Sequence, residues 1–156
     1  MNTNRRSFLK TSATAGAVSV AVGAGLLTPR AVLAAWPKNA FEAKDLNAAL
    51  KAAMGSSSLT DSGDIKLKAP DIAENGAVVP ITVTSKIPGT ESISILIPNN
   101  ATPLAANFNL SSNTQGYVST RVKMGKTSDV IAVVKAGGKL YSSKKEVKVT
   151  IGGCGG

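Results

Sequence analysis

The chain carries a single thiol, Cys154, which stands in the last five residues, Gly152-Gly153-Cys154-Gly155-Gly156. A thiolate can form and break a covalent bond to another sulfur atom, so this residue is the first candidate for chemistry. Glycine loses more conformational freedom on ordering than any other residue, and this composition therefore predicts a flexible arm with a solvent-exposed thiol. Fully extended, five residues span at most about 17 Å. The arm is predicted to carry its thiol into narrow clefts of other proteins.

The neighbours of Cys154 do not activate it. An unperturbed cysteine has a pKa of about 8.5, so only a small fraction is thiolate at neutral pH. The chain contains no histidine, and the nearby terminal carboxylate of Gly156 disfavours a second negative charge. We infer that activation comes from the sites that the arm enters. Cys154 is therefore predicted to be a covalent attachment point in a protein that is not an enzyme by itself.

The composition excludes most other chemistry. With His 0 and Cys 1 in 156 residues, the chain cannot build a Ser-His-Asp triad, a histidine-ligated metal site, a multi-cysteine zinc site or an intrachain disulfide. Hydrophobic residues make up 43% of the chain, which favours a folded domain, whereas aromatics make up only 4%. The core must therefore be filled by aliphatic side chains.

Residues 1–34 are predicted to be an export signal that is removed. The pair Arg5 and Arg6 precedes an uncharged run of about 17 residues rich in glycine and alanine, and small residues lead up to Ala34. This pattern resembles a twin-arginine signal, which predicts export of the folded chain to the periplasm and cleavage after Ala34 or one residue later. A transmembrane anchor is the alternative, but the run is short and only mildly apolar.

Cleavage changes the charge of the protein. Residues 1–34 contain four basic residues and no acid, so a formal charge of +9 falls to +5 in residues 35–156. Arg121 is then the only arginine, whereas nucleic-acid readers use arginine forks and aromatic platforms. Nucleic acid is therefore not an expected partner, and neither is a membrane after cleavage. A modest positive charge suits an acidic protein partner or small inorganic anions.

Residues 35–63 are predicted to form an N-terminal helix and a linker. Asn39 can cap the helix while Glu42 reaches back, and Gly55 can end it. Trp36 is expected to be a packing anchor. The apolar stripe that identifies the helix comprises Leu46, Ala49, Leu50, Ala53 and Met54. It is the only helix expected.

Residues 64–151 change to a period of two, which predicts seven or eight short strands. Gly137-Gly138 is predicted to be the turn of a hairpin, and Pro80 predicts a strand at a sheet edge. The apolar positions that alternate with polar ones are Val79, Ile81, Val83; Ile93, Ile95, Ile97; Phe108, Leu110; Val118, Val122, Met124; and Val147, Val149, Ile151. One apolar and one polar face are typical of a half-buried antiparallel sheet. We therefore expect a mainly β, immunoglobulin-like antiparallel β-sandwich, preceded by one N-terminal helix and followed by the arm at 152–156.

Taken together, the paired-arginine signal, the helix-then-β domain without histidine and the terminal Gly-Gly-Cys-Gly-Gly resemble the SoxY family, the sulfur-carrying subunits of the periplasmic thiosulfate-oxidising Sox system. The resemblance implies that Cys154 is the sulfur attachment site. It also implies three partner enzymes: a c-type cytochrome complex that couples thiosulfate to the cysteine as a thioconjugate, a metal-dependent hydrolase that releases sulfate, and a sulfane dehydrogenase. A SoxZ-like β-sandwich subunit would complete a heterodimer. No cofactor is expected in this chain, since haem and metal would belong to the partner enzymes.

Other interpretations of the same residues stay open. The chain could be an exported β-sandwich interaction module that is crosslinked through its tail cysteine. A redox or copper-handling protein is disfavoured, because only Met54 and Met124 would accompany Cys154 as soft ligands. Lys144, Lys145 and Lys148 could attract anions, although a solvated strand edge is the simpler explanation. An exposed edge strand with apolar neighbours is a plausible docking surface.

Overall fold

A computed structural model of the chain describes residues 37–150. The predicted export signal with Arg5 and Arg6, the proposed cleavage position, Trp36, Ile151 and the arm at 152–156 lie outside these residues. The strand and helix predictions all fall in the described part, apart from Ile151.

The helical segment consists of two helices, α2 at Lys38–Glu42 and α3 at Leu46–Met54. The predicted stripe lies on α3, which ends at Gly55 in the left-handed conformation, as expected. Asn39, predicted as the helix cap, lies inside α2 and makes no capping bond. Instead, Asp45 caps α3, because its carboxylate stands directly before the stripe and accepts from the backbone N–H of Ala48 at 2.8 Å. Neither helix is long and apolar enough to cross a membrane.

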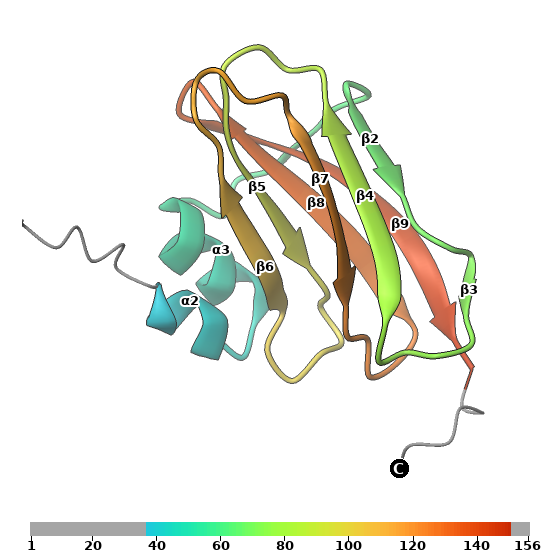
Figure 1. Ribbon diagram of the computed structural model, residues 1–156. Helices are drawn as coiled ribbons and strands as arrows, with labels where there is room; N and C mark the ends of the chain where they lie inside the picture. Colours follow the sequence, from blue (N-terminus) through green and yellow to red (C-terminus); the bar gives the residue numbers. More distant parts are fainter. Residues whose placement is uncertain (1–36, 151–156) are drawn as a thin grey trace, which may run out of the picture. The chain divides into compact units, whose positions relative to one another are not determined.

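In the described part of the chain, nine strands follow the helices: β1 Thr60–Asp61, β2 Ile65–Lys68, β3 Ile72–Ala73, β4 Val79–Ser85, β5 Thr90–Leu96, β6 Leu104–Asn109, β7 Tyr117–Val122, β8 Ser128–Ala136 and β9 Lys139–Val149. They form a large sheet in the order β1-β9-β8-β5-β6, with β3 also paired to β9, and a small sheet in the order β2-β4-β7 (Figure 1). The longer pairs are antiparallel, and the two-residue strands β1 and β3 pair with β9 in parallel. The predicted mainly β fold with two sheets after an N-terminal helical region is confirmed, but between residues 37 and 150 the single expected helix is divided into α2 and α3, and nine strands stand where seven or eight were expected.

The turn at Gly137-Gly138 is confirmed, with φ of 54° and 73° at the two glycines. Pro80 does not mark an edge strand, since β4 is the middle strand of its sheet. However, β2 pairs with β4 only from Thr82 onward, so β4 is unpaired on that side at Pro80.

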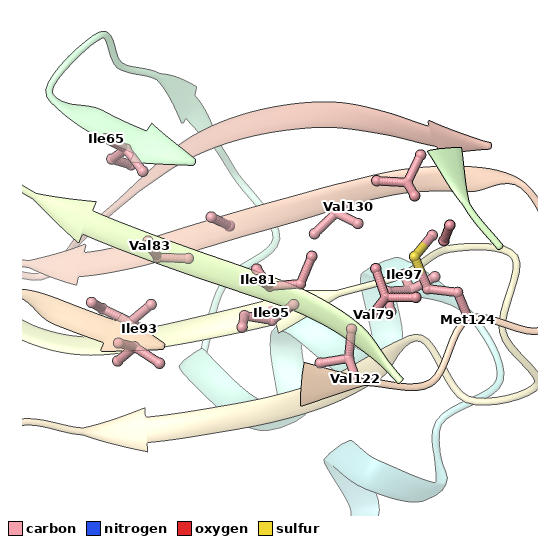
Figure 2. Packing of buried hydrophobic residues seen from close by; sticks show 14 of the residues in the cluster. Ile65, Val79, Ile81, Val83, Ile93, Ile95, Ile97, Val122, Met124 and Val130 are labelled. Carbon is pink, nitrogen blue, oxygen red and sulfur yellow. The ribbon is translucent and has the colours of Figure 1, made fainter. Parts of the chain in front are cut away.

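The sheets enclose one apolar core, and the helices cover a second. In Figure 2 the labelled side chains of β4, β5 and the neighbouring strands meet between the two sheets, with Met124 beside Ile97. The second core joins α3 to Leu96, Leu104, Val133 and Leu140 on the opposite face of the large sheet. Strand β5 is therefore buried on both faces, and the prediction of one polar face is wrong for it. Its serine Ser94 is fully buried and donates to Asn107 Oδ1 at 2.6 Å.

Candidate functional site

The predicted attachment site follows directly on β9. This strand ends at Val149, and the described part ends at Thr150, four residues before Cys154. Cys154 and the four glycines at 152, 153, 155 and 156 lie outside the described residues, so their roles remain predictions. The structure describes the end of β9, which is the part of the domain that the arm follows in the chain.

Hydrogen bonds hold the chain on two sides up to the last described residue. The backbone N–H of Val149 donates to Thr127 Oγ1 at 2.9 Å, on the side of the β7–β8 connection. The backbone N–H of Thr150 donates to the carbonyl of Ala73 at 3.2 Å, on the side of β3. The base of the arm is thus fixed by segments more than twenty residues away in sequence. Two-residue β3 has no periodic signal, so the sequence could not indicate it.

Gly76 lets a loop approach this base closely. Its carbonyl accepts from the backbone N–H of Met124 at 2.6 Å. A Cβ at position 76 would overlap the carbonyl oxygen of Met124 and Cγ1 of Val149. Glycine is therefore required here by the close approach of the backbone of the β7–β8 connection and the side chain of the last β9 residue.

The three lysines near the last strand do not act together. Lys145 Nζ donates to the carbonyl of Ala69 at 2.6 Å and pairs with Asp71 Oδ1 at 2.9 Å. It therefore ties the β2–β3 connection to β9 and is not free to attract anions. Lys144 and Lys148 are exposed. Glu146 lies between them on the same face of β9, because the three residues are spaced two apart, and its negative charge offsets theirs.

A groove of about 780 Å³ opens near the base of the arm. It is lined by the β5–β6 connection, the end of β7 and the start of the β7–β8 connection. These segments lie at the lower end of the sandwich in Figure 1, where β9 also ends. Arg121, Lys123 and Lys126 bring three positive charges to its lining, which includes no carboxylate. Phe41 of α2 and Leu104 of β6 supply apolar surface. We call this feature the cationic groove.

Hydrogen bonds of two asparagine side chains join the loops that form the cationic groove. Asn100 Nδ2 donates to the carbonyl of Lys123 at 2.7 Å, and Asn100 Oδ1 accepts from the backbone N–H of Gly125 at 3.0 Å. Asn99 Nδ2 donates to the carbonyl of Thr127 at 2.7 Å. The β7–β8 connection, which carries Lys123 and Lys126, is therefore hydrogen-bonded to the β5–β6 connection. The sequence drew attention to Arg121 only as the sole arginine of residues 35–156, and nothing in it linked Arg121 to Lys126 or to position 100.

The described residues offer no assembled metal site. Within residues 37–150, no three His, Cys, Asp or Glu side chains gather closely enough to hold a metal ion. The two methionines considered as soft ligands are buried in different cores: Met54, the last residue of α3, packs between the helices and the large sheet, and Met124 packs between the two sheets. They are not brought together.

Residues 50–154 match the family model described as "Sulfur oxidation protein SoxY", and the match extends through the position of Cys154. The structure of the sulfur carrier protein SoxY from Chlorobium limicola f thiosulfatophilum is 48% identical and superposes with a TM-score of 0.60, covering 66% of this chain and 94% of that one. A lytic polysaccharide monooxygenase from Jonesia denitrificans is 11% identical with a TM-score of 0.37, covering 47% of this chain and 54% of that one, and supports no argument. No curated protein matched. Since the family model spans well over half of the sequence, this chain belongs to the SoxY family of sulfur oxidation proteins.

Proposed function

We propose that this protein is the sulfur carrier of a Sox thiosulfate-oxidising system and holds its substrate covalently on Cys154. The observation that carries the proposal is the SoxY family match, which runs to the position of the only thiol in the chain. The 48% identical structure is itself that of a sulfur carrier protein. A thiol at the end of a short glycine-rich segment, with no histidine in the chain, suits a carrier whose catalytic groups reside elsewhere.

The proposed loading step forms a sulfur–sulfur bond. The Cys154 thiol and thiosulfate, S₂O₃²⁻, combine to Cys154–S–S–SO₃⁻ and release one proton and two electrons. The electrons pass to a c-type cytochrome partner, which serves as the oxidant. Water then cleaves the terminal S–S bond of the adduct in a metal-dependent partner hydrolase, which leaves Cys154–S–SH and hydrogensulfate. A sulfane dehydrogenase would oxidise the remaining sulfur.

The protein's own part in this cycle is to hold and present the sulfur. The arm begins at a strand end that is fixed on both sides by Thr127 and Ala73, so its point of departure from the domain is constant. Haem and metal are assigned to the partner enzymes, and a SoxZ-like β-sandwich subunit completes the carrier. The paired arginines Arg5 and Arg6 direct the chain to the periplasm, where these partners would act.

The proposal is tested by the mass of the C-terminal peptide. The exported protein is isolated from cells given thiosulfate, and the peptide is measured before and after reduction. We expect reductant-labile additions of thiosulfonate or of one or more sulfur atoms on Cys154, and none in a Cys154→Ser variant. A stable Cys154 disulfide without sulfur adducts would instead support the crosslinked interaction module. Normal thiosulfate oxidation by a Cys154→Ser strain that has no other carrier would refute the proposed role.

A further inference from the structure

We propose that the cationic groove is an intramolecular resting site for the loaded arm and binds the sulfonate end of the Cys154 adduct. This inference rests on the proposed function, since it concerns the same thioconjugate. Its occupant is residues 151–156 of this chain in their loaded form. The groove would hold the cargo between visits to partner enzymes.

The charges of the cationic groove fit such an anion. Arg121, Lys123 and Lys126 line it without a carboxylate, and none of the three forms an ion pair with any residue between 37 and 150. A sulfonate offers three acceptor oxygens and one negative charge, and a guanidinium presents paired N–H donors to such groups. Loading adds one negative charge and three acceptor oxygens to the arm, so the cationic groove would bind the loaded arm more strongly than the unloaded one.

The arm begins within reach of the cationic groove. Lys126 is adjacent in sequence to Thr127, and Thr127 Oγ1 accepts the hydrogen bond from the backbone N–H of Val149 at 2.9 Å. From there, the five residues from Thr150 to Cys154 span at most about 17 Å. The attached thiosulfonate adds further length. Of the three groove cations, Lys126, the neighbour of the residue that anchors Val149, is the nearest in the chain to the base of the arm.

The groove also offers surface for the neutral part of the adduct. Phe41 and Leu104 line it beside the cations, and bonds from the amides of Asn99 and Asn100 keep its loops together. Sulfane sulfur is soft and poorly hydrated, so it favours such an apolar wall. Docking there would shield the S–S bond from soluble thiolates. Such a thiolate, RS⁻, attacks the Cys154 sulfur, forms Cys154–S–S–R and expels thiosulfate.

The adduct can be made without any partner enzyme. Tetrathionate reacts with the Cys154 thiolate: the central S–S bond of S₄O₆²⁻ breaks, Cys154–S–S–SO₃⁻ forms and S₂O₃²⁻ leaves. The mature chain, residues 35–156, is labelled with ¹⁵N and its amide spectrum is recorded before and after loading. We expect shifts at residues 99–101 and 121–126, together with those of the arm itself. Free thiosulfate added to the Cys154→Ser variant is expected to leave these groove amides unchanged.

Two charge variants test the groove directly. The Arg121→Gln/Lys123→Gln/Lys126→Gln variant should lose the groove shifts on loading. A matched control, Lys66→Gln/Lys86→Gln/Lys139→Gln, removes three exposed lysines outside the groove and should keep them. Release of thiosulfate by 2-mercaptoethanol, which carries no charged group other than its reacting thiolate, should be about threefold faster or more in the groove variant and unchanged in the control.

Loading that shifts only the arm, or equal effects of the two charge variants, would overturn the inference. Shifts of the groove amides by free thiosulfate in the Cys154→Ser variant would also overturn it, because the groove would then be a site for soluble anions. Since tetrathionate loading requires no Sox enzyme, these results are independent of whether cells load Cys154 with thiosulfate. Failure of the resting site and failure of the carrier role are therefore distinguishable.

Discussion

The hydroxyl oxygen of Thr127 accepts a hydrogen bond from the backbone N–H of Val149 at 2.9 Å. This bond joins the last residue of β9 to the connection that carries Lys123 and Lys126. The carbonyl of Thr127 in turn accepts from Asn99 Nδ2 on the opposite side of the cationic groove. The base of the arm and the groove are therefore parts of one hydrogen-bonded unit.

Thr127→Val is expected to loosen the base of the arm without unfolding the domain. Valine has the shape of threonine but lacks the acceptor oxygen, and one such bond contributes about 0.5–1.5 kcal/mol. Hydrogen exchange of the Val149 amide should be about two- to tenfold faster. Thr84→Val is the control, since the Thr84 hydroxyl makes no hydrogen bond within residues 37–150. Unchanged exchange at Val149 would show that this bond does not hold the strand end.

Gly76→Ala is expected to destabilise the fold, because the added methyl group would overlap the Met124 carbonyl and the Val149 side chain. Such overpacking costs about 1–3 kcal/mol, which lowers the melting temperature by several degrees. Gly63→Ala is the matched control, because a Cβ at Gly63 would meet nothing within 4 Å. Calorimetry of both variants checks this. Equal melting temperatures would contradict the close approach at Gly76.

Lys145→Gln is expected to cost more stability than Asp71→Asn. Asp71 is 89% exposed, so its ion pair with Lys145 is largely screened and contributes about 0.2–1 kcal/mol. Lys145 also donates to the carbonyl of Ala69 at 2.6 Å, and this bond persists in Asp71→Asn. Urea titration should therefore give a loss of about 1 kcal/mol or more for Lys145→Gln and less than half of that for Asp71→Asn. The reverse order would assign the stabilisation to the ion pair.

Asp45→Ala and Asn39→Ala distinguish the observed helix cap from the predicted one. The Asp45 carboxylate accepts from the backbone N–H of Ala48, and loss of such a cap costs about 1 kcal/mol. Asn39 makes no capping bond, and its replacement by alanine, a better helix former, should be neutral or slightly stabilising. Chemical denaturation of the two variants measures the difference. A larger loss for Asn39→Ala would place the helix cap at Asn39, as the sequence pattern predicts.

The strand pattern shows where prediction from sequence is strong. Val79, Ile81 and Val83 alternate with polar residues, and the structure buries all three between the sheets. Alternation is a local property of the backbone, so it predicts burial wherever one face is covered. It was misleading for β5, because α3 covers the second face of that strand through Leu96. Which face a helix covers depends on the topology of the domain and not on the strand.

What can be read along the chain is the position of its one thiol among four glycines, the paired arginines before an uncharged run, and the periods of helix and strand. These depend on composition and on near neighbours, which is why the mainly β fold and the SoxY family follow from them. The cationic groove, the pairing of Lys145 with Asp71 and the attachment of Val149 to Thr127 are decided by tertiary structure alone. Each joins residues more than twenty positions apart, and only the folding of the sheets brings such residues within hydrogen-bonding distance.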